Sequence, residues 1–388
     1  MTYCWKKAAL AVGAAVALSG IGAGAHSVPV SASEEAAGNG VRITRYLGLQ
    51  TLPHKMEFEG TVVGGFSGMD RDPLTGIWYF LSDDRWRYNP ARFYTGRLDI
   101  DPVTGDFGGV EVTGVETLLD ENGEPYPGFG KQRSVDPESI RFDRWSRQLL
   151  WAQEGDRPDA GHPDVPLAQQ SLRWATKSGR HLGEVRLPDN LKLTETDSGT
   201  RRNTGIEALT FTATGIVAAN EDPRYEDGPL PTVDEGATTR ITVWDRLHRV
   251  KAQYAYEIDA LPAAPIPPGG ITDSGVSEIL AVDGGRFLVL ERSWIEGVDY
   301  RTKLYEIDLR GATDVLDRDS LADGEGYTAV SKRLVHDFGD SDRPQQNLEA
   351  MAWGPRLRTG ECTLVVAADD NFDSREVAEF HAFAVRGC

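Results

Sequence analysis

The sequence predicts an all-β fold, a β-propeller with five four-stranded blades. Two observations support this prediction. A short motif recurs five times at nearly constant spacing, which is typical of a repeat architecture. The composition, with 42 Gly, 21 Pro and 9% aromatic residues, favours short strands that are joined by turns. A sixth blade with a degraded motif is the alternative.

The recurring motif opens each predicted blade. Its copies begin at Ser67, Glu138, Glu207, Glu278 and Glu349, which are 71, 69, 71 and 71 residues apart. In each copy an apolar stretch, a turn that contains Gly or Asp, and a second apolar stretch follow one another, as in a β-hairpin. A second hairpin completes each unit, so each unit predicts one blade of four strands.

The two ends of the chain are expected to complete the last blade together. Only residues 350–388 follow the last motif, whereas residues 41–52 form a β-prone run with no other partner. Insertion of that run into the last blade closes the ring and leaves no free sheet edge. Cys362 and Cys388 fall at the same end of adjacent strands and predict a disulfide; two separate thiols are the alternative.

The first residues predict a secretory signal peptide. Lys6 and Lys7 precede an uncharged, Ala-rich run over residues 8–25, which ends in a small-residue cleavage site. A membrane anchor is the alternative, because the run has about the minimum length of a span. We expect a signal peptide over 1–25, a flexible segment over 26–40 and one propeller domain over 41–388. The protein is then secreted, monomeric and without a membrane span after cleavage.

The acidic composition excludes some partners and permits others. Lys and Arg total 41 against 60 Asp and Glu, for a formal net charge of −19. This balance disfavours binding to nucleic acid or to anionic membranes, since both require cations that face phosphate. It permits bound cations.

The repeat also predicts a functional site. The motif glutamates precede the first strand of each hairpin, and a second acidic or basic group follows the second strand, so both groups meet at one mouth of the central channel. The candidate catalytic carboxylates are Glu138, Glu207, Glu278 and Glu349. The candidate substrate-binding arginines are Arg85, Arg133, Arg202 and Arg292. The candidate metal ligands are Asp84, Asp369, Asp370 and Asp373.

Calcium is the expected cofactor at this mouth. Crowded carboxylates repel one another, and a hard divalent cation with six to eight oxygen ligands relieves that repulsion. Asp369, Asn371 and Asp373 have the spacing that begins a calcium loop, although the rest of an EF-hand is absent. The alternative interpretation is that the repeated glutamates and arginines join neighbouring blades through hydrogen bonds and ion pairs.

Other catalytic motifs are missing from the sequence. It contains no G-x-S-x-G nucleophile elbow, no H-E-x-x-H zinc motif and no P-loop. The seven histidines are scattered singly, and only His54 precedes the first motif closely.

Five segments together resemble the phytase-like family, which is described as having esterase-like activity. They are GGFSGMDRDPLTGIWYFLSDDR, DPESIRFD, NTGIEALTF, GVSEILAVDGGRFLVLERSW and QNLEAMAWGP, and the resemblance covers residues 46–385. The family consists of secreted β-propeller proteins. Its description implies hydrolysis of an ester or phosphate ester, by analogy with calcium-dependent β-propeller phytases.

These observations lead to one main functional hypothesis and two alternatives. We expect a secreted hydrolase of a small-molecule ester or phosphate ester, assisted by calcium at the acidic mouth. The first alternative is a non-catalytic propeller that binds a ligand or partner through its mouth loops. A glycosidase with a pair of carboxylates is the least favoured, because the repeated glutamates single out no such pair.

Overall fold

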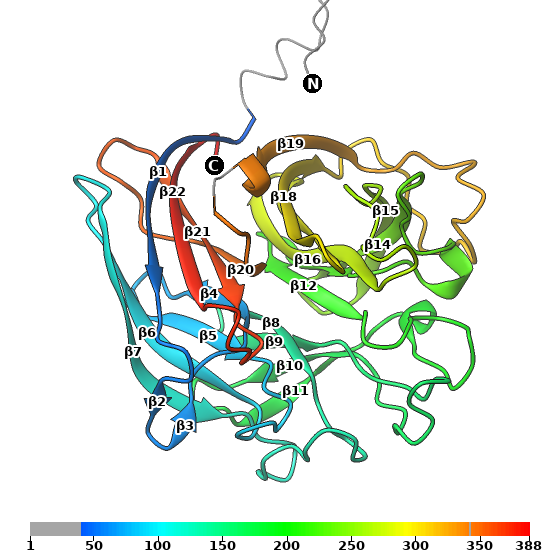
Figure 1. Cartoon of the computed structure of the whole chain (residues 1–388), viewed down its shortest axis with the longest axis horizontal. Coiled ribbons are helices and arrows are strands. Elements are labelled where there is room, and N and C mark those ends of the chain that lie inside the picture. Colours follow the sequence, from blue (N-terminus) through cyan, green and yellow to red (C-terminus); the bar gives the residue numbers. More distant parts are fainter. Residues whose placement is uncertain (1–39, 341–342) are drawn as a thin grey trace, which may run out of the picture. The chain divides into compact units, whose positions relative to one another are not determined.

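The computed structural model describes residues 40–340 and 343–388, and the predicted signal peptide lies outside these residues. Twenty-two strands and three short 3-10 helices make up the regular structure of the described part (Figure 1). None of these helices has the length or apolar character that a membrane span requires. Twenty of the strands form five four-stranded antiparallel sheets, which confirms the predicted five-bladed propeller.

The sheets follow one another along the chain as blades 1 to 5. Blade 1 contains β4 (Phe66–Arg71), β5 (Trp78–Ser82), β6 (Arg92–Ile100) and β7 (Phe107–Thr117). Blade 2 contains β8 (Pro137–Phe142), β9 (Leu149–Gln153), β10 (Ser171–Ala175) and β11 (His181–Val185). Blade 3 contains β12 (Ile206–Phe211), β13 (Gly215–Asn220), β14 (Ala237–Asp245) and β15 (Val250–Ile258).

The last two blades contain the longest hairpin and the ring closure. Blade 4 contains β16 (Thr272–Asp283), β17 (Arg286–Ile295), β18 (Asp299–Asp308) and β19 (Ser331–Asp337). Blade 5 contains β20 (Asn347–Trp353), β21 (Cys362–Asp369), β22 (Glu379–Arg386) and β1 (Arg42–Thr51). The small ribbon of β2 (Glu57–Phe58) and β3 (Thr61–Val62) precedes blade 1.

Apolar packing between neighbouring blades holds the ring together. Five clusters of buried side chains lie one at each interface, including the interface between blades 5 and 1. In β9, Leu149 and Trp151 pack toward blade 1, whereas Leu150 and Ala152 pack toward blade 3. Because successive residues of a strand point to opposite faces, such continuous apolar strands can be buried on both sides.

The N-terminal strand closes the ring as predicted. Strand β1 pairs antiparallel with β22, from Arg42 opposite Arg386 to Thr51 opposite Glu379 (Figure 1). Cys362 and Cys388 form the predicted disulfide within the same blade. The innermost strands β4, β8, β12, β16 and β20 contact one another in turn, and β20 contacts β4.

Each innermost strand has a β-bulge at the equivalent point near its start. The bulges lie between Phe66 and Gly68, Pro137 and Ile140, Ile206 and Ala208, Val276 and Glu278, and Leu348 and Ala350. In each blade we call the residue directly after Phe66, Pro137, Ile206, Val276 or Leu348 the bulge position. The five bulge positions are Ser67, Glu138, Glu207, Ser277 and Glu349. A bulge re-aims the side chain that it carries, and bulges are frequent beside functional sites.

Blade 4 departs from the predicted repeat by one residue. Its bulge position holds Ser277, so Glu278 is the following residue and is not equivalent to the other motif glutamates. Since side chains alternate along a strand, a shift of one residue sends Glu278 to a different place. The motif spacing predicted Glu278 at the mouth. The structure instead places it in the channel, next to Arg141.

A buried ion pair occupies the channel below the bulges. Arg141 of β8 and Glu278 of β16 lie 2.6 Å apart and are almost completely buried. The Arg141 guanidinium also donates to the carbonyl oxygens of Met69, Leu209 and Ile279, the last two at 2.6 and 3.0 Å. One side chain thereby joins the innermost strands of four blades.

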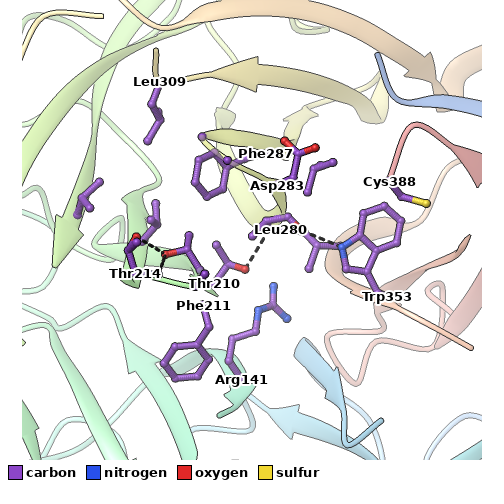
Figure 2. A pocket seen from close by; sticks show the side chains of 18 of the residues that line it. Arg141, Thr210, Phe211, Thr214, Leu280, Asp283, Phe287, Leu309, Trp353 and Cys388 are labelled. Carbon is purple, nitrogen blue, oxygen red and sulfur yellow. Dashed lines mark hydrogen bonds between the residues drawn. The ribbon is translucent and has the colours of Figure 1, made fainter. Parts of the chain in front are cut away.

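The channel opens on the far side of Arg141 into a wide cavity of about 1340 Å³ (Figure 2). It lies at the ends of the innermost strands that are opposite to the bulges. Phe211, Leu280, Phe287 and Trp353 are among the residues that line it. We call it the wide mouth.

We predict that Arg141→Met destabilises the protein by about 3–5 kcal/mol, because it leaves the Glu278 charge buried without a partner. The double variant Arg141→Met/Glu278→Met should recover part of that loss, since both charges are then absent. Chemical denaturation of the two variants measures the effect. Additive losses in the double variant would show that the pair is not coupled.

Candidate functional site

An acidic cavity of about 260 Å³ lies at the mouth near the bulges. Its wall contains nine carboxylates, from Asp83, Asp136, Glu138, Glu154, Glu207, Glu221, Asp273, Glu349 and Asp369. The other charged residues of the wall are Arg85 and Arg292. Asn203, Asn347, Asn371, Trp294 and Tyr300 complete it. We call this space the acidic cavity.

Two rings of side chains, each with one member per blade, supply most of the charge. The bulge positions form the first ring, in which Glu138, Glu207 and Glu349 reach the cavity. The second ring lies on the other strand of each hairpin or directly after it, one residue after the residue that pairs with the one before the bulge position. Its members are Asp83, Glu154, Glu221, Arg292 and Asp369.

The first ring is interrupted by two serines that bind backbone. Ser67 donates to the carbonyl oxygen of Pro137 at 2.9 Å, and Ser277 donates to that of Leu348 at 3.3 Å. In each case the acceptor directly precedes the bulge glutamate of another blade. These two serines therefore link blades, whereas the three glutamates face the cavity.

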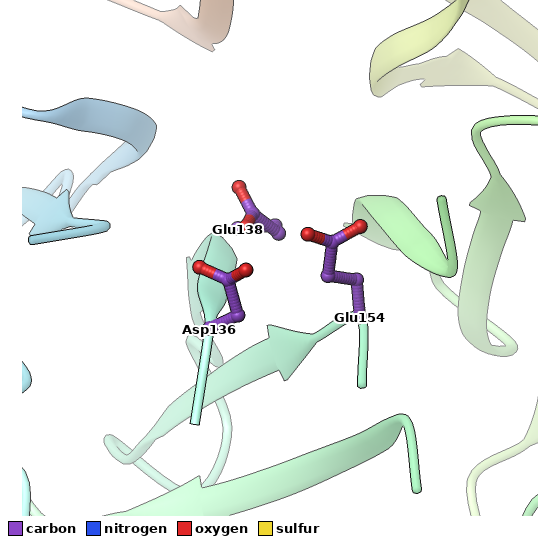
Figure 3. A group of neighbouring side chains, drawn as sticks. All are labelled: Asp136, Glu138 and Glu154. Carbon is purple, nitrogen blue, oxygen red and sulfur yellow. The ribbon is translucent and has the colours of Figure 1, made fainter. Parts of the chain in front are cut away.

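Blades 2 and 3 bring five carboxylates into two groups. Asp136, Glu138 and Glu154 form the first group, and their side chains converge in Figure 3. Glu154, Glu207 and Glu221 form the second. Within each group the potential ligand oxygens lie within 4.8 Å of one another, and every member is buried. We call these groups triad A and triad B.

Burial raises the pKa of these carboxyl groups. It is the largest cause for Glu138, Glu154, Glu207 and Glu221, and neighbouring carboxylates raise the pKa further. Burial also raises the pKa of Glu349, against the effect of the nearby Arg292. Without a cation, these carboxyl groups therefore hold their protons more tightly than exposed carboxyl groups do.

The two arginines neutralise only part of the wall. Arg85 lies 2.9 Å from Asp136, donates to Asn203 at 2.8 Å and stacks on Phe129 with 4.3 Å to the ring centroid. Arg292 lies 2.7 Å from Glu221 and 3.4 Å from Glu349. Arg85 is 27% exposed and Arg292 only 7%, so Arg85 is the one that a ligand can reach.

The donor chemistry of the acidic cavity fits a hard divalent cation. Glu207 Oε2, Asp369 Oδ2 and Asp136 Oδ1 are buried and have no hydrogen-bond partner. Asp136 Oδ2 accepts no hydrogen bond either, but it is ion-paired with Arg85 at 2.9 Å. Among the described residues, the wall offers carboxylate and amide oxygens as metal ligands, and it contains no histidine or cysteine. This set of ligands favours calcium or magnesium over zinc.

Comparison with known proteins places the chain in a family. The model of the family described as "Phytase-like: Esterase-like activity of phytase" matches residues 61–372. The chain belongs to the phytase-like family. No curated protein matches it.

Three solved structures match this phytase-like chain at 8–10% sequence identity. A GH43 β-1,3-galactosidase with galactodeoxynojirimycin has a TM-score of 0.43 at 9% identity, over 86% of this chain and 94% of that one. A GH43 protein from Bacillus licheniformis has a TM-score of 0.37 at 10% identity, over 82% and 50%. A protein of unknown function from Dyadobacter fermentans has a TM-score of 0.38 at 8% identity, over 89% and 99%.

Half of the residues predicted for the site of the phytase-like protein line the acidic cavity. They are Glu138, Glu207, Glu349, Asp369, Arg85 and Arg292. The structure thus brings together three of the four candidate catalytic carboxylates and two of the four arginines.

Three other predicted residues lie close to the cavity but face elsewhere. Glu278 pairs with Arg141 in the channel. Asp84 is buried against Arg92 at 2.5 Å, and Asp370 accepts a hydrogen bond from the Gly65 amide at 2.9 Å. In both Asp-Asp pairs the first aspartate, and not the second, faces the cavity, because adjacent side chains diverge.

The remaining three predicted residues lie outside the cavity wall. Arg133 pairs with Asp120 and Glu121 and is half exposed. Arg202 pairs with Asp156 at 2.9 Å. Asp373 pairs with Arg375 at the surface, so it does not join Asp369 and Asn371 in a calcium loop.

Sequence reasoning did not select several residues of the wall. Glu154 and Glu221 follow the second strand of their hairpins, so the position shared with Asp369 was a usable signal. Asp136 precedes its motif, and Asp273 lies on the extended start of β16. For these two residues the repeat carries no signal, because only individual blades have an acid there.

We predict that the calcium-free protein loses thermal stability from about pH 5 to about pH 8. The folded state raises the pKa of Glu278 to about 7 and that of Asp222 to about 8, in both cases mainly through burial. Folded protein therefore binds these protons more tightly than unfolded protein, so stability is lost as pH rises through these values.

Calcium should offset this loss at high pH, since it takes the place of protons on Glu138, Glu154, Glu207 and Glu221, whose pKa values are also raised. Melting temperatures in chelator and in calcium across this pH range test the prediction. A melting temperature that rises with pH in chelator, or that calcium leaves unchanged at pH 8, would contradict it.

Proposed function

We propose that this phytase-like propeller is a secreted, monomeric hydrolase of phosphate esters or other small-molecule esters, which acts at the acidic cavity with bound calcium. The observation that carries the proposal is the cavity itself, where nine carboxylates, seven of them buried, face two arginines. The family description supports an esterase-type reaction. The disulfide is consistent with an exported protein.

The triads are the residues that would hold the cation. Glu138, Glu154 and Glu207 have no lysine, arginine or histidine nitrogen within 4.0 Å among the described residues, so their charges are left for a ligand. When bound, calcium would neutralise these carboxylates and polarise an ester oxygen or a water molecule.

Arg85 is the residue best placed to bind the substrate. Its guanidinium lies on the cavity wall, is partly exposed and is held in position by Asp136, Asn203 and Phe129. A planar guanidinium with fixed orientation binds two oxygens of a phosphate or carboxylate group at once. Arg85 therefore orients an anionic substrate toward the triads.

Glu349 is the carboxylate best placed to accept a proton. It belongs to neither triad, lies 3.4 Å from Arg292 and lines the same cavity. Burial raises its pKa, and a base is most effective when its pKa is near the working pH. We assign it the removal of a proton from the attacking water.

Binding of a ligand without catalysis is the second candidate. It is favoured by one observation: among the described residues, the cavity wall contains no serine, cysteine or histidine that could form a nucleophile and base pair. Hydrolysis by water needs no such pair, so the two candidates differ in turnover and not in the fold.

We predict calcium-dependent hydrolysis of p-nitrophenyl phosphate, p-nitrophenyl acetate or phytate. Glu349→Gln should lower kcat by about 10²-fold or more, because it removes the general base. Arg85→Met should act mainly on KM for the anionic substrates. Steady-state kinetics in calcium and in chelator measure both effects.

Glu111→Gln provides the matched control. Glu111 is exposed on the outermost strand of blade 1, so this variant should keep wild-type activity. Absence of turnover for all three substrates in calcium, with a melting temperature that calcium does raise, would favour the binding protein over the hydrolase.

A further inference from the structure

We propose that the acidic cavity binds two divalent cations, with Glu154 as the ligand that they share. This inference deepens the proposed function and rests on its assignment of a cation to the triads. The geometry that points to it is the overlap of triad A and triad B in a single residue.

Glu154 is placed between two blades. It follows β9 of blade 2, on the side of Asp136 and Glu138, and it also lies within ligand distance of Glu207 and Glu221 of blade 3. The residue is 2% exposed, and its carboxylate accepts a long hydrogen bond of 3.4 Å from the Gly205 amide. A carboxylate has two oxygens, and one oxygen can serve each cation.

Each triad contains one buried oxygen without a partner. In triad A it is Oδ1 of Asp136, and in triad B it is Oε2 of Glu207. These residues are only 4% and 7% exposed, so water does not solvate them freely. Unpartnered buried oxygens are costly, and a cation at each triad would satisfy one of them. A single cation would leave the other oxygen unpaired.

The charge of the five triad residues also favours two cations. Arg85 pairs with Asp136 and Arg292 pairs with Glu221, the outer members of the two triads. Glu138, Glu154 and Glu207 then retain three negative charges. One divalent cation leaves this region negative, whereas two leave it with a single positive charge. The four other carboxylates of the wall, Asp83, Asp273, Glu349 and Asp369, keep the whole cavity negative, so a second cation also reduces the repulsion that an anionic ester meets there.

Calcium titration of the chelator-treated full chain by isothermal calorimetry tests the proposal. We expect two calcium ions per chain in the wild type. Glu138→Gln should weaken one binding event and Glu207→Gln the other, whereas Glu154→Gln should weaken both by about tenfold or more. Glu111→Gln should still bind two. One calcium ion per wild-type chain, or loss of only one event in Glu154→Gln, would overturn the proposal.

Melting temperatures separate cation binding from a purely structural role of Glu154. In chelator, Glu154→Gln should raise the melting temperature, because it removes one of several repelling charges. Calcium should raise the melting temperature of this variant by less than it raises that of the wild type. A lower melting temperature in chelator would show that Glu154 joins the blades, and would contradict the proposal.

The two proposals can fail separately. Two bound calcium ions without hydrolysis of any ester would refute the proposed function and leave the two-cation site intact. Full hydrolytic activity with only one bound calcium ion per chain would refute the two-cation site and leave the proposed function intact.

Discussion

Mutual repulsion among carboxylates at one end of the channel is the constraint on which the site depends. Closure of the ring brings the starts of five innermost strands together, and their bulges turn Glu138, Glu207 and Glu349 toward one small space. Four more acids enter from the second ring, while blade 4 contributes Arg292 in place of the fifth. Buried like charges are tolerated only with protons or cations between them, so the fold itself creates a demand for positive charge.

The channel shows how the same fold satisfies such a demand within the protein. Glu278 is also a buried carboxylate, but Arg141 faces it at 2.6 Å and binds carbonyl oxygens of three other blades. No comparable cation reaches Glu138, Glu154 or Glu207 among the described residues. The difference separates a structural ion pair from a ligand site, although Glu278, Glu138 and Glu207 all belong to copies of one repeated motif.

The architecture was predictable from the sequence because its signals are local and repeated. The motif spacing, the hairpin turns, the strand that precedes Leu52 and the two cysteines indicated the blades and the closure correctly. The site was predictable only in part. Glu278 was misplaced because Ser277 occupies the bulge, and a sequence does not reveal which residue of a strand is bulged. Asp84 was chosen in place of Asp83, and Asp370 was chosen beside Asp369, because a sequence does not reveal which of two adjacent aspartates faces the cavity.

The most direct test is a crystal structure of the protein grown with calcium, with an anomalous difference map at a long X-ray wavelength. The account predicts anomalous density among Asp136, Glu138, Glu154, Glu207 and Glu221, with the unpartnered oxygens of Asp136 and Glu207 turned toward it. A cavity without anomalous density, in which these carboxylates instead contact the backbone of neighbouring blades, would contradict the account.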